Sequence, residues 1–497
     1  MVARGLFLLG ERIMNWRFVV STVAILGQAF SPVLAMPSPP AFENNLTRAI
    51  TLQGHERDRF TLADRMSHFG VPGVGVAIVD HCRIVDARGF GRATLNGSPV
   101  TERTLFQAAS LSKPLTAVAA LRLAEERKVR LDADIGPLLH NWILPHSESA
   151  GNGPVTLRQL LGHRAGTNVE GFDGYLPGSR LPTLSQILRG EVPANNDPVR
   201  VDKTAGTTFS YSGGGYVVAQ ALMIGATHQS FPQLMQRLVL DPTGMRSSTY
   251  AQPLDAAHAR LAAQGTGPDG TPMAMRWHVY PELAPAGLWT TPTDYGRFMI
   301  ALARSVRGEK HGLLSSTYAN QLMARGPGNW GLGVDLGAIG PTRKFSHTGA
   351  NAGYQSAFVM YPDTCQGAVV MTNGDEGNWL IGEIMRAAGE AYHWPDRKQP
   401  IVKAALPLTD EIVNTFVGTY QLRDFPTEKF KISRKAGGGL YLAREGHIGR
   451  DLLPGDGNRL FSPDSEMTIE ATDQVVGRAS TLEIGFGGGK NIAQRVD

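Results

Sequence analysis

Apolar residues recur along this chain with two different periods, one typical of strands and one of helices. Apolar runs at residues 74–79 and 83–90, joined by the turn Asp80-His81-Cys82, predict a β-hairpin. Residues 356–361 and 367–372 predict a second hairpin. Helical spacing of apolar residues predicts helices over residues 43–69, 115–126, 216–226, 233–240, 293–303 and 379–392.

The order of these elements predicts how the chain is organised. A hairpin near the start, helices in the middle, and a hairpin with a helix at the end indicate an α/β fold, with a mixed antiparallel sheet flanked by helices and an inserted helical subdomain. We assign this domain to residues 43–393. Prolines and weak periodicity predict a linker over 394–408. Short strand-like runs at 416–422, 429–433, 440–443 and 482–486 predict a small antiparallel β domain over 409–497.

The N-terminal residues have the pattern of an export signal. Arg12 and Arg17 precede an almost wholly apolar or small run over residues 18–30, and Val33-Leu34-Ala35 supplies the small residues that a signal peptidase requires. The run is shorter than the ~20 residues that span a bilayer. We therefore predict a signal peptide over residues 1–35, cleavage after Ala35, and a periplasmic or secreted protein without a stable membrane span.

Composition narrows the classes of protein to consider. With 58 Gly and 42% hydrophobic residues among 497, the chain is expected to be globular and rich in loops rather than disordered. The net charge of +4 is spread along the chain, so we expect no nucleic-acid partner. Two cysteines exclude a disulfide-rich scaffold and a four-thiolate zinc site, and leave one bridge or two free thiols.

The segment Phe106-Gln107-Ala108-Ala109-Ser110-Leu111-Ser112-Lys113-Pro114 carries the first candidate chemistry. Ser110 and Lys113 stand three residues apart where a helix is predicted to begin, so one turn places both side chains on one face. A serine hydroxyl needs a neighbouring base and a positive potential to act as a nucleophile, and Lys113 and the helix N-terminus supply them. By itself the pattern also fits a helix-capping serine followed by a solvent-exposed lysine.

Two later motifs add candidate residues. Phe209-Ser210-Tyr211-Ser212-Gly213 places Tyr211 in a Gly-rich loop before a helix, although a tyrosine taken alone also fits a core position. In His347-Thr348-Gly349-Ala350 the small residues let a substrate approach the backbone, although His347 also fits a structural role. The leucine-rich surroundings of His163 predict a structural histidine at a buried helix end.

Together and in this order, the three motifs resemble those of the serine β-lactamase and penicillin-binding-protein superfamily, in its class C and DD-peptidase branch. That family has Ser-x-x-Lys, Tyr-x-Asn and Lys/His-Thr-Gly. The segments at 157–166, 242–245 and 286–291 resemble further signatures of the family. The resemblance covers roughly residues 45–393 and implies a serine hydrolase that needs no metal or other cofactor. The C-terminal β domain resembles lipocalin-like accessory barrels that restrict the active site in some members.

The resemblance implies a role for each matching residue. Ser110 would be the nucleophile, Lys113 would accept its proton, and Tyr211 would pass that proton to the leaving group. The backbone N–H groups of Ser110 and Ala350 would form an oxyanion hole. His347 would line the pocket and favour a substrate carboxylate, which Thr348 beside Gly349 would hydrogen-bond.

One position departs from the family pattern. Gly213 stands where the family has Asn, so an amide that would orient the substrate's own amide is missing, and efficient β-lactam hydrolysis is not expected. His347 in place of Lys is similar to the DD-peptidase and D-amino-acid peptidase members. We therefore expect an acyl-enzyme hydrolase of D-amino-acid peptides (DD-carboxypeptidase-like) or small esters. The alternatives are a weak class C-type β-lactamase and a non-catalytic penicillin-binding-type sensor of cell-wall peptides.

Two further expectations concern loops and cysteines. We expect substrate choice to depend on the loops at 166–181 and 266–282. The first and last strands of the family's sheet are antiparallel neighbours, which implies that Cys82 and Cys365 reach the same rim, within the Cα separation of about 4.4–6.8 Å that a disulfide requires. An oxidising compartment would preserve the bond. Two separate buried thiols are the alternative.

Overall fold

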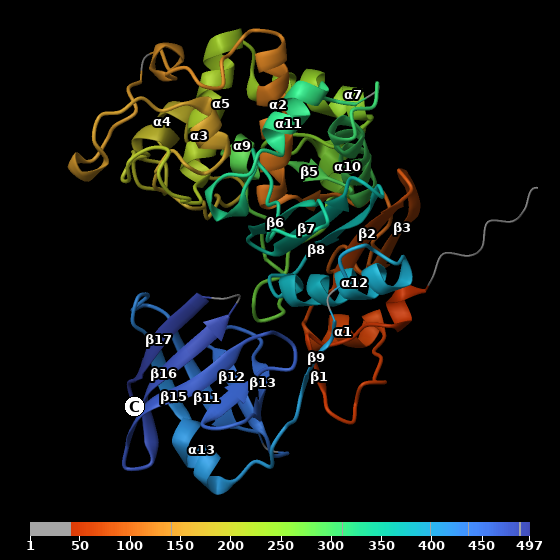
Figure 1. Ribbon diagram of the computed structural model, residues 1–497, viewed down its shortest axis with the longest axis vertical. Coiled ribbons are helices and arrows are strands. Elements are labelled where there is room, and N and C mark those ends of the chain that lie inside the picture. The colour runs from red at the N-terminus through yellow and green to blue at the C-terminus, as the bar shows by residue number, and fades with distance from the viewer. Residues whose placement is uncertain (1–40, 141, 311, 398, 436, 487–488) are drawn as a thin grey trace, which may run out of the picture. The chain divides into compact units, whose positions relative to one another are not determined.

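A five-stranded antiparallel sheet, in the order β3-β2-β8-β7-β6, forms the centre of the larger domain (Figure 1). The computed structural model describes residues 41–140, 142–310, 312–397, 399–435, 437–486 and 489–497. The predicted signal peptide lies outside them. The strands of this sheet are β2 (Gly73–Asp80), β3 (Arg83–Gly91), β6 (Phe345–Asn351), β7 (Tyr354–Tyr361) and β8 (Gln366–Thr372). The two predicted hairpins are confirmed, and β2 of the first pairs with β8 of the second, with Val76 opposite Val370.

Helices cover both faces of this sheet (Figure 1). Val74, Val76 and Ile78 of β2 pack in one apolar cluster, with residues of α12 (Gly377–Ala391) and α1 (Leu62–His68). Ala77 and Val79 point to the other face and pack in a second cluster, with residues of α10 (Pro292–Val306). Because successive side chains of a strand point to opposite faces, a strand that is buried on both has an unbroken apolar run. The α/β fold predicted from the sequence is confirmed.

The helical subdomain lies between β3 and β6 in the chain. Its central helix α2 (Ser112–Glu125) is buried at every residue from 112 to 121, so it carries no polar face there. The helices predicted from residue 115 onward are present, and each begins one to three residues earlier than predicted. The other helices and strands of this part are β4 (Phe106–Gln107), η2 (Ala109–Leu111), η3 (Gly136–Leu138), η4 (Glu148–Ala150), α3 (Leu157–Leu161), α4 (Leu184–Arg189), α5 (Gly213–Thr227), α6 (Phe231–Met235), η5 (Gln236–Leu240), α7 (Asp241–Thr243), α8 (Ala256–Leu261), α9 (Leu283–Ala286), β5 (Trp289–Thr290), α11 (Ser316–Leu322) and η6 (Pro327–Asn329).

The helix predicted over residues 43–69 is wrong for most of its length. The structure has η1 (Phe42–Asn44), β1 (Ile50–Leu52) and only then α1, whose N-cap Thr61 accepts a hydrogen bond from the Asp64 N–H. Leu46 and Phe60 pair across a β-bridge instead. The apolar residues of this segment are spaced as in a helix because turns bring each of them back to the same apolar cluster, which contains Leu46, Leu62 and Met66. β1 pairs in parallel with β9 (Ile401–Lys403), which lies inside the predicted linker.

The C-terminal β domain is a closed eight-stranded antiparallel barrel. The predicted strand at 416–422 begins at 418, because residue 416 still belongs to α13 (Asp410–Phe416). Four strands, β13, β14, β15 and β17, were not predicted. The barrel strands are β10 (Gly418–Leu422), β11 (Lys429–Arg434), β12 (Leu440–Arg444), β13 (Arg450–Pro454), β14 (Arg459–Phe461), β15 (Thr468–Val475), β16 (Arg478–Phe486) and β17 (Gly489–Arg495).

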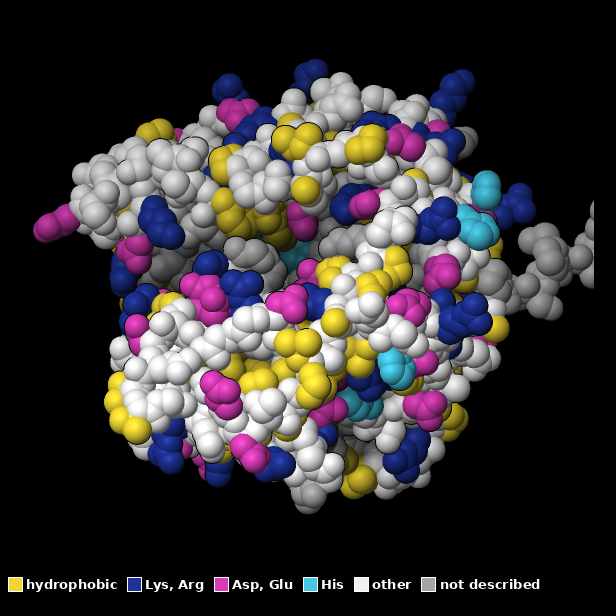
Figure 2. All heavy atoms as spheres, turned by 60° about the horizontal axis from the view of Figure 1, so that its bottom comes forward, with side chains coloured by type: hydrophobic (Ala, Val, Ile, Leu, Met, Phe, Trp, Pro, Cys, Tyr) yellow, Lys and Arg dark blue, Asp and Glu magenta, His cyan; other side chains and the backbone are white. Residues whose placement is uncertain are grey.

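The surface mixes charges of both signs. Figure 2 shows acidic and basic side chains interspersed over the face that it draws, with hydrophobic side chains scattered among them. This distribution agrees with the small net charge of +4. In the part of the chain that the structure describes, no helix combines the length and the apolar character needed to cross a membrane.

Candidate active site

Ser110 and Lys113 lie where the short helix η2 runs into α2. The Nζ of Lys113 donates a hydrogen bond to Ser110 Oγ over 2.8 Å and another to the carbonyl of Pro285 over 3.2 Å. Lys113 is buried, unlike the solvent-exposed lysine of the capping alternative. Ala109 has a φ of +51°, a left-handed conformation that is costly for a residue with a Cβ and that fixes how the backbone presents Ser110.

Tyr211 reaches the same place from the start of α5. The Nζ of Lys113 lies 4.9 Å from the centre of the Tyr211 ring and 5.7 Å from that of Tyr216, within the range of a cation–π contact. Ser212 caps α5 by accepting a hydrogen bond from the Gly215 N–H over 3.0 Å. The cap fixes the last residues before the helix, and so the structure brings Tyr211, Lys113 and Ser110 together.

His163, which the sequence marks only as a structural residue, is in direct contact with this group. Its ring stacks on Tyr211 with centroids 4.3 Å apart, and its Nδ1 accepts the Ser212 N–H over 3.1 Å. Its carbonyl accepts the Ser210 N–H over 2.8 Å. Burial, and then the neighbouring Lys113, hold the pKa of His163 well below its usual value, so the imidazole is neutral and Nδ1 is free to accept.

Residues His347–Ala350 lie in strand β6, which runs beside Ser110. Thr348 and Ala350 lie on the exposed side of the strand, whereas His347 and Gly349 lie on the buried side. A Cβ at position 349 would lie 3.1 Å from Ser110 N and 2.5 Å from the carbonyl oxygen of Ala108. Only glycine therefore lets the strand approach the backbone of Ser110 so closely.

His347 is a neutral group in this structure. Burial, and then the proximity of Lys113, lower the pKa of His347 to about 3. Its Nδ1 lies 2.5 Å from the carbonyl oxygen of Thr348, which accepts the hydrogen bond, so Nε2 keeps its lone pair. A neutral imidazole offers no charge to a substrate carboxylate, so His347 itself could favour a carboxylate only through a hydrogen bond.

A model of the Beta-lactamase family matches residues 61–390. The chain belongs to this family. Penicillin-binding protein 4 of Amycolatopsis lactamdurans is 27% identical over 394 residues, which cover 72% of this chain and 97% of the relative.

Solved structures agree on the fold of this Beta-lactamase family protein. The octameric penicillin-binding protein homologue from Pyrococcus abyssi has a TM-score of 0.55 and 19% identity, and the match covers 87% of this chain and 98% of that one. The D-amino acid amidase from Ochrobactrum anthropi SV3 has a TM-score of 0.54 and 20% identity, with 66% and 96% covered.

In this Beta-lactamase family protein, Tyr211 lies in a cluster of aromatic rings, whose other members are His163, Phe209, Trp330 and His347. The Trp330 ring lies 5.1 Å from both histidine rings, nearly perpendicular to each, and 5.8 Å from Tyr211. Phe209 stacks on Trp330 at 5.5 Å. Trp330 was not predicted, and the one clue to it in the sequence is its place in a Gly-rich run, Gly328-Asn329-Trp330-Gly331-Leu332-Gly333.

The two loops expected to govern substrate choice pair with each other. The Tyr175 N–H donates to the Val279 carbonyl over 2.8 Å, and the Val279 N–H donates back over 2.7 Å. Gln107, three residues before Ser110, donates through Nε2 to the carbonyl of His278 over 2.7 Å. The paired loops are thus tied to the segment that carries the serine.

Glu282 is the most unusual carboxyl group near the site. It is fully buried, three residues before the Pro285 whose carbonyl holds Lys113. Burial raises the pKa of Glu282 from 4.5 to about 7. The sequence offered no sign of this group.

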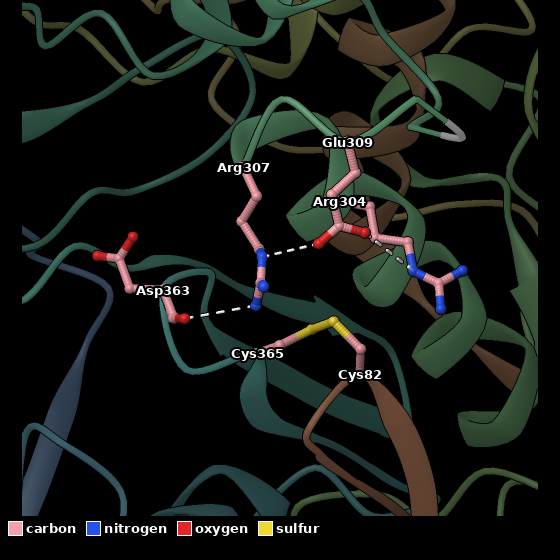
Figure 3. The surroundings of a disulfide bond; sticks show 6 residues. All are labelled: Cys82, Arg304, Arg307, Glu309, Asp363 and Cys365. Carbon is pink, nitrogen blue, oxygen red and sulfur yellow. Dashed lines mark hydrogen bonds and ion pairs between the residues drawn. A yellow bond between two sulfur atoms is a disulfide. The ribbon is translucent and has the colours of Figure 1, made fainter.

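Cys82 and Cys365, the pair that the resemblance implied, form a disulfide with their Cα atoms 5.0 Å apart (Figure 3). They lie in the turns that follow β2 and precede β8, where the Cys82 N–H donates to the Cys365 carbonyl. Figure 3 also shows Arg307 next to the bond, between Glu309 and the carbonyl of Asp363. In the described part of the chain, no group of three His, Cys, Asp or Glu side chains is arranged to hold a metal ion.

Proposed function

We propose that this protein is a serine hydrolase that works through an acyl-enzyme, with Ser110 as the nucleophile and Lys113 as its base. The observation that carries the proposal is the 2.8 Å hydrogen bond between Lys113 Nζ and Ser110 Oγ. In the proposed step Lys113 acts as the free amine: Ser110 Oγ attacks the carbonyl carbon of an ester or amide while its proton passes to the lone pair of Lys113 Nζ. No carboxylate pairs with Lys113 among the described residues, so it is not held in an ion pair.

The remaining steps use the groups around this pair. The N–H groups of Ser110 and Ala350 stabilise the oxyanion of the tetrahedral intermediate. Tyr211 passes the proton from Lys113 to the leaving alcohol or amine, and the carbon–heteroatom bond breaks. Water then attacks the acyl-enzyme, gives one proton to restore Ser110, and releases the acid. The Lys113–Tyr211 contact supports this path for the proton.

The proposed substrates are D-amino-acid peptides or amides, as for a DD-carboxypeptidase, and small esters. Membership of the Beta-lactamase family and the fold shared with a D-amino acid amidase support this class. We further propose a periplasmic or secreted location, on the N-terminal pattern alone. Gly213, which lacks the family's amide, favours a second candidate, a penicillin-binding-type sensor that binds cell-wall peptides without turnover.

Labelling with a fluorescent fluorophosphonate, followed by mass mapping, tests the proposal. The label is expected on Ser110, and Ser110→Ala should lose both the label and all turnover of p-nitrophenyl esters and D-alanyl p-nitroanilide. Ser185→Ala, at an exposed position of α4, is the control and should keep both. Labelling that persists without Ser110, or maps to Ser210 or Ser212, contradicts the proposal. Label without turnover on any substrate favours the sensor.

A further inference from the structure

The position at which this chain departs from its family is occupied by another side chain. Gly213 begins α5 two residues after Tyr211. A Cβ built on Gly213 would lie 2.9 Å from Cε2 of Phe172 and 3.0 Å from the carbonyl oxygen of Glu170. Side chains do not pack so closely, so an asparagine at 213 requires the Phe172 ring to move. The Phe172 ring therefore occupies space that the side chain of an asparagine at 213 would need.

The loop that carries Phe172 is fixed on both sides of the site. On one side, the Gly213 N–H donates to the Glu170 carbonyl over 2.9 Å. On the other, the Asp173 carbonyl accepts a hydrogen bond from the Tyr280 hydroxyl over 3.3 Å. That hydroxyl accepts the Ala352 N–H, just beyond β6, over 3.0 Å. The loop thus runs from the tyrosine motif to the end of the strand that flanks Ser110.

Neither Phe172 nor Gly213 brings a polar side-chain atom to this place, although Glu170 and Asp173 of the same loop carry carboxyl groups. Phe172 is half-buried and packs against the apolar core of the helical subdomain. Gly213 adds no polar atom. A hydrogen-bonding substrate group placed against these two residues would lose water without gaining a partner from them, whereas an aliphatic or aromatic group gains stability from each part of its apolar surface that it buries.

We propose that Phe172 and Gly213 form an apolar subsite that selects esters carrying an aliphatic or aromatic group, on the acyl or the alcohol side, over substrates with a hydrogen-bonding amide there. This inference rests on the hydrolase function proposed above. It makes Phe172 a specificity-determining residue.

The test compares the wild type with Phe172→Ala, Gly213→Asn and the double variant. One ester series lengthens the acyl chain of p-nitrophenyl esters from acetate to hexanoate, and a second lengthens the alcohol of alkyl acetates. The wild type should prefer the longer chain in one series, and Phe172→Ala should reduce that ratio of kcat/KM by about tenfold or more. Gly213→Asn should lower both turnover and melting temperature, and adding Phe172→Ala should recover part of the melting temperature, because the ring no longer meets the new side chain while the Glu170 carbonyl still does.

The controls separate failure of this inference from failure of the proposed function. Phe425→Ala removes an exposed phenylalanine of the β domain and should change neither ratio. If Phe172→Ala does not fold, Phe172→Leu should still reduce the chain-length ratio. A wild type that labels at Ser110 and turns over esters, but whose ratios are the same in all variants, overturns the inference alone. A wild type with neither label nor turnover overturns the proposed function and this inference with it.

Discussion

Replacing His163 should disable the site without unfolding the protein. His163→Ala removes a ring stacked 4.3 Å from Tyr211 and the Nδ1 that accepts the Ser212 N–H. Leaving a buried N–H unpaired costs about 1–3 kcal/mol, and losing an aromatic pair about 0.5–1.5 kcal/mol. Both losses fall on the residues that position Tyr211. A displacement of about 1 Å in a reacting group lowers a rate by about 10²-fold, so we expect the rate of Ser110 acylation to fall by about that factor.

The assay is the rate of fluorophosphonate labelling together with the melting temperature. His228→Ala is a matched control, because His228 is exposed and has the same φ of +54° as His163, so the backbone cost of alanine is shared. His163→Asn keeps an acceptor for the Ser212 N–H and should recover part of the rate, whereas His163→Phe keeps only the stacked ring. A labelling rate for His163→Ala within threefold of the His228→Ala rate would refute the reasoning.

Three further outcomes are expected. Lys113→Ala and Tyr211→Phe should each slow acylation or deacylation of a p-nitrophenyl ester by about 10²-fold or more, because each removes a positioned acid–base group. Near-normal rates in both variants would mean that the proton path is misassigned. Burial raises the pKa of Glu282 to about 7, so the folded protein favours its neutral form; below about pH 4.5 the carboxyl is neutral in the folded and the unfolded chain alike, and as the pH rises to 7 ionisation of the unfolded chain lowers the free energy of unfolding by about 3 kcal/mol. In urea unfolding, the stability of Glu282→Gln should therefore rise relative to that of the wild type between pH 4.5 and 8. A difference in unfolding free energy that does not change with pH would contradict this. Thiol titration of the denatured, unreduced protein should find no free thiol, and two free thiols per chain would contradict the disulfide. The double variant Cys82→Ala/Cys365→Ala should unfold more readily, because the bond joins residues 283 apart and such a crosslink adds about 5 kcal/mol to the free energy of unfolding.

Local patterns were sufficient for strands β2, β3, β7 and β8 of the sheet and for the order of the motifs, whereas strand β6 was in neither predicted hairpin. The apolar run of β2 predicted a strand because a strand buried on both faces needs no polar positions. The spacing of Ser110 and Lys113 placed both on one side of a helix turn because that relation depends on only three residues. The same reasoning failed over residues 43–69, where contacts such as the bridge between Leu46 and Phe60 produced helix-like spacing through turns.

The tertiary structure alone decided the character of the site. The family resemblance implied that His347 favours a carboxylate, but the charge of its imidazole depends on burial and on Lys113, 234 positions away in the chain. The stacking of His163 on Tyr211 and the place of Phe172 beside Gly213 likewise join segments that no periodicity relates. Desolvation, ring contacts and excluded volume depend on which atoms become neighbours, and in a packed interior those neighbours come from distant parts of the chain.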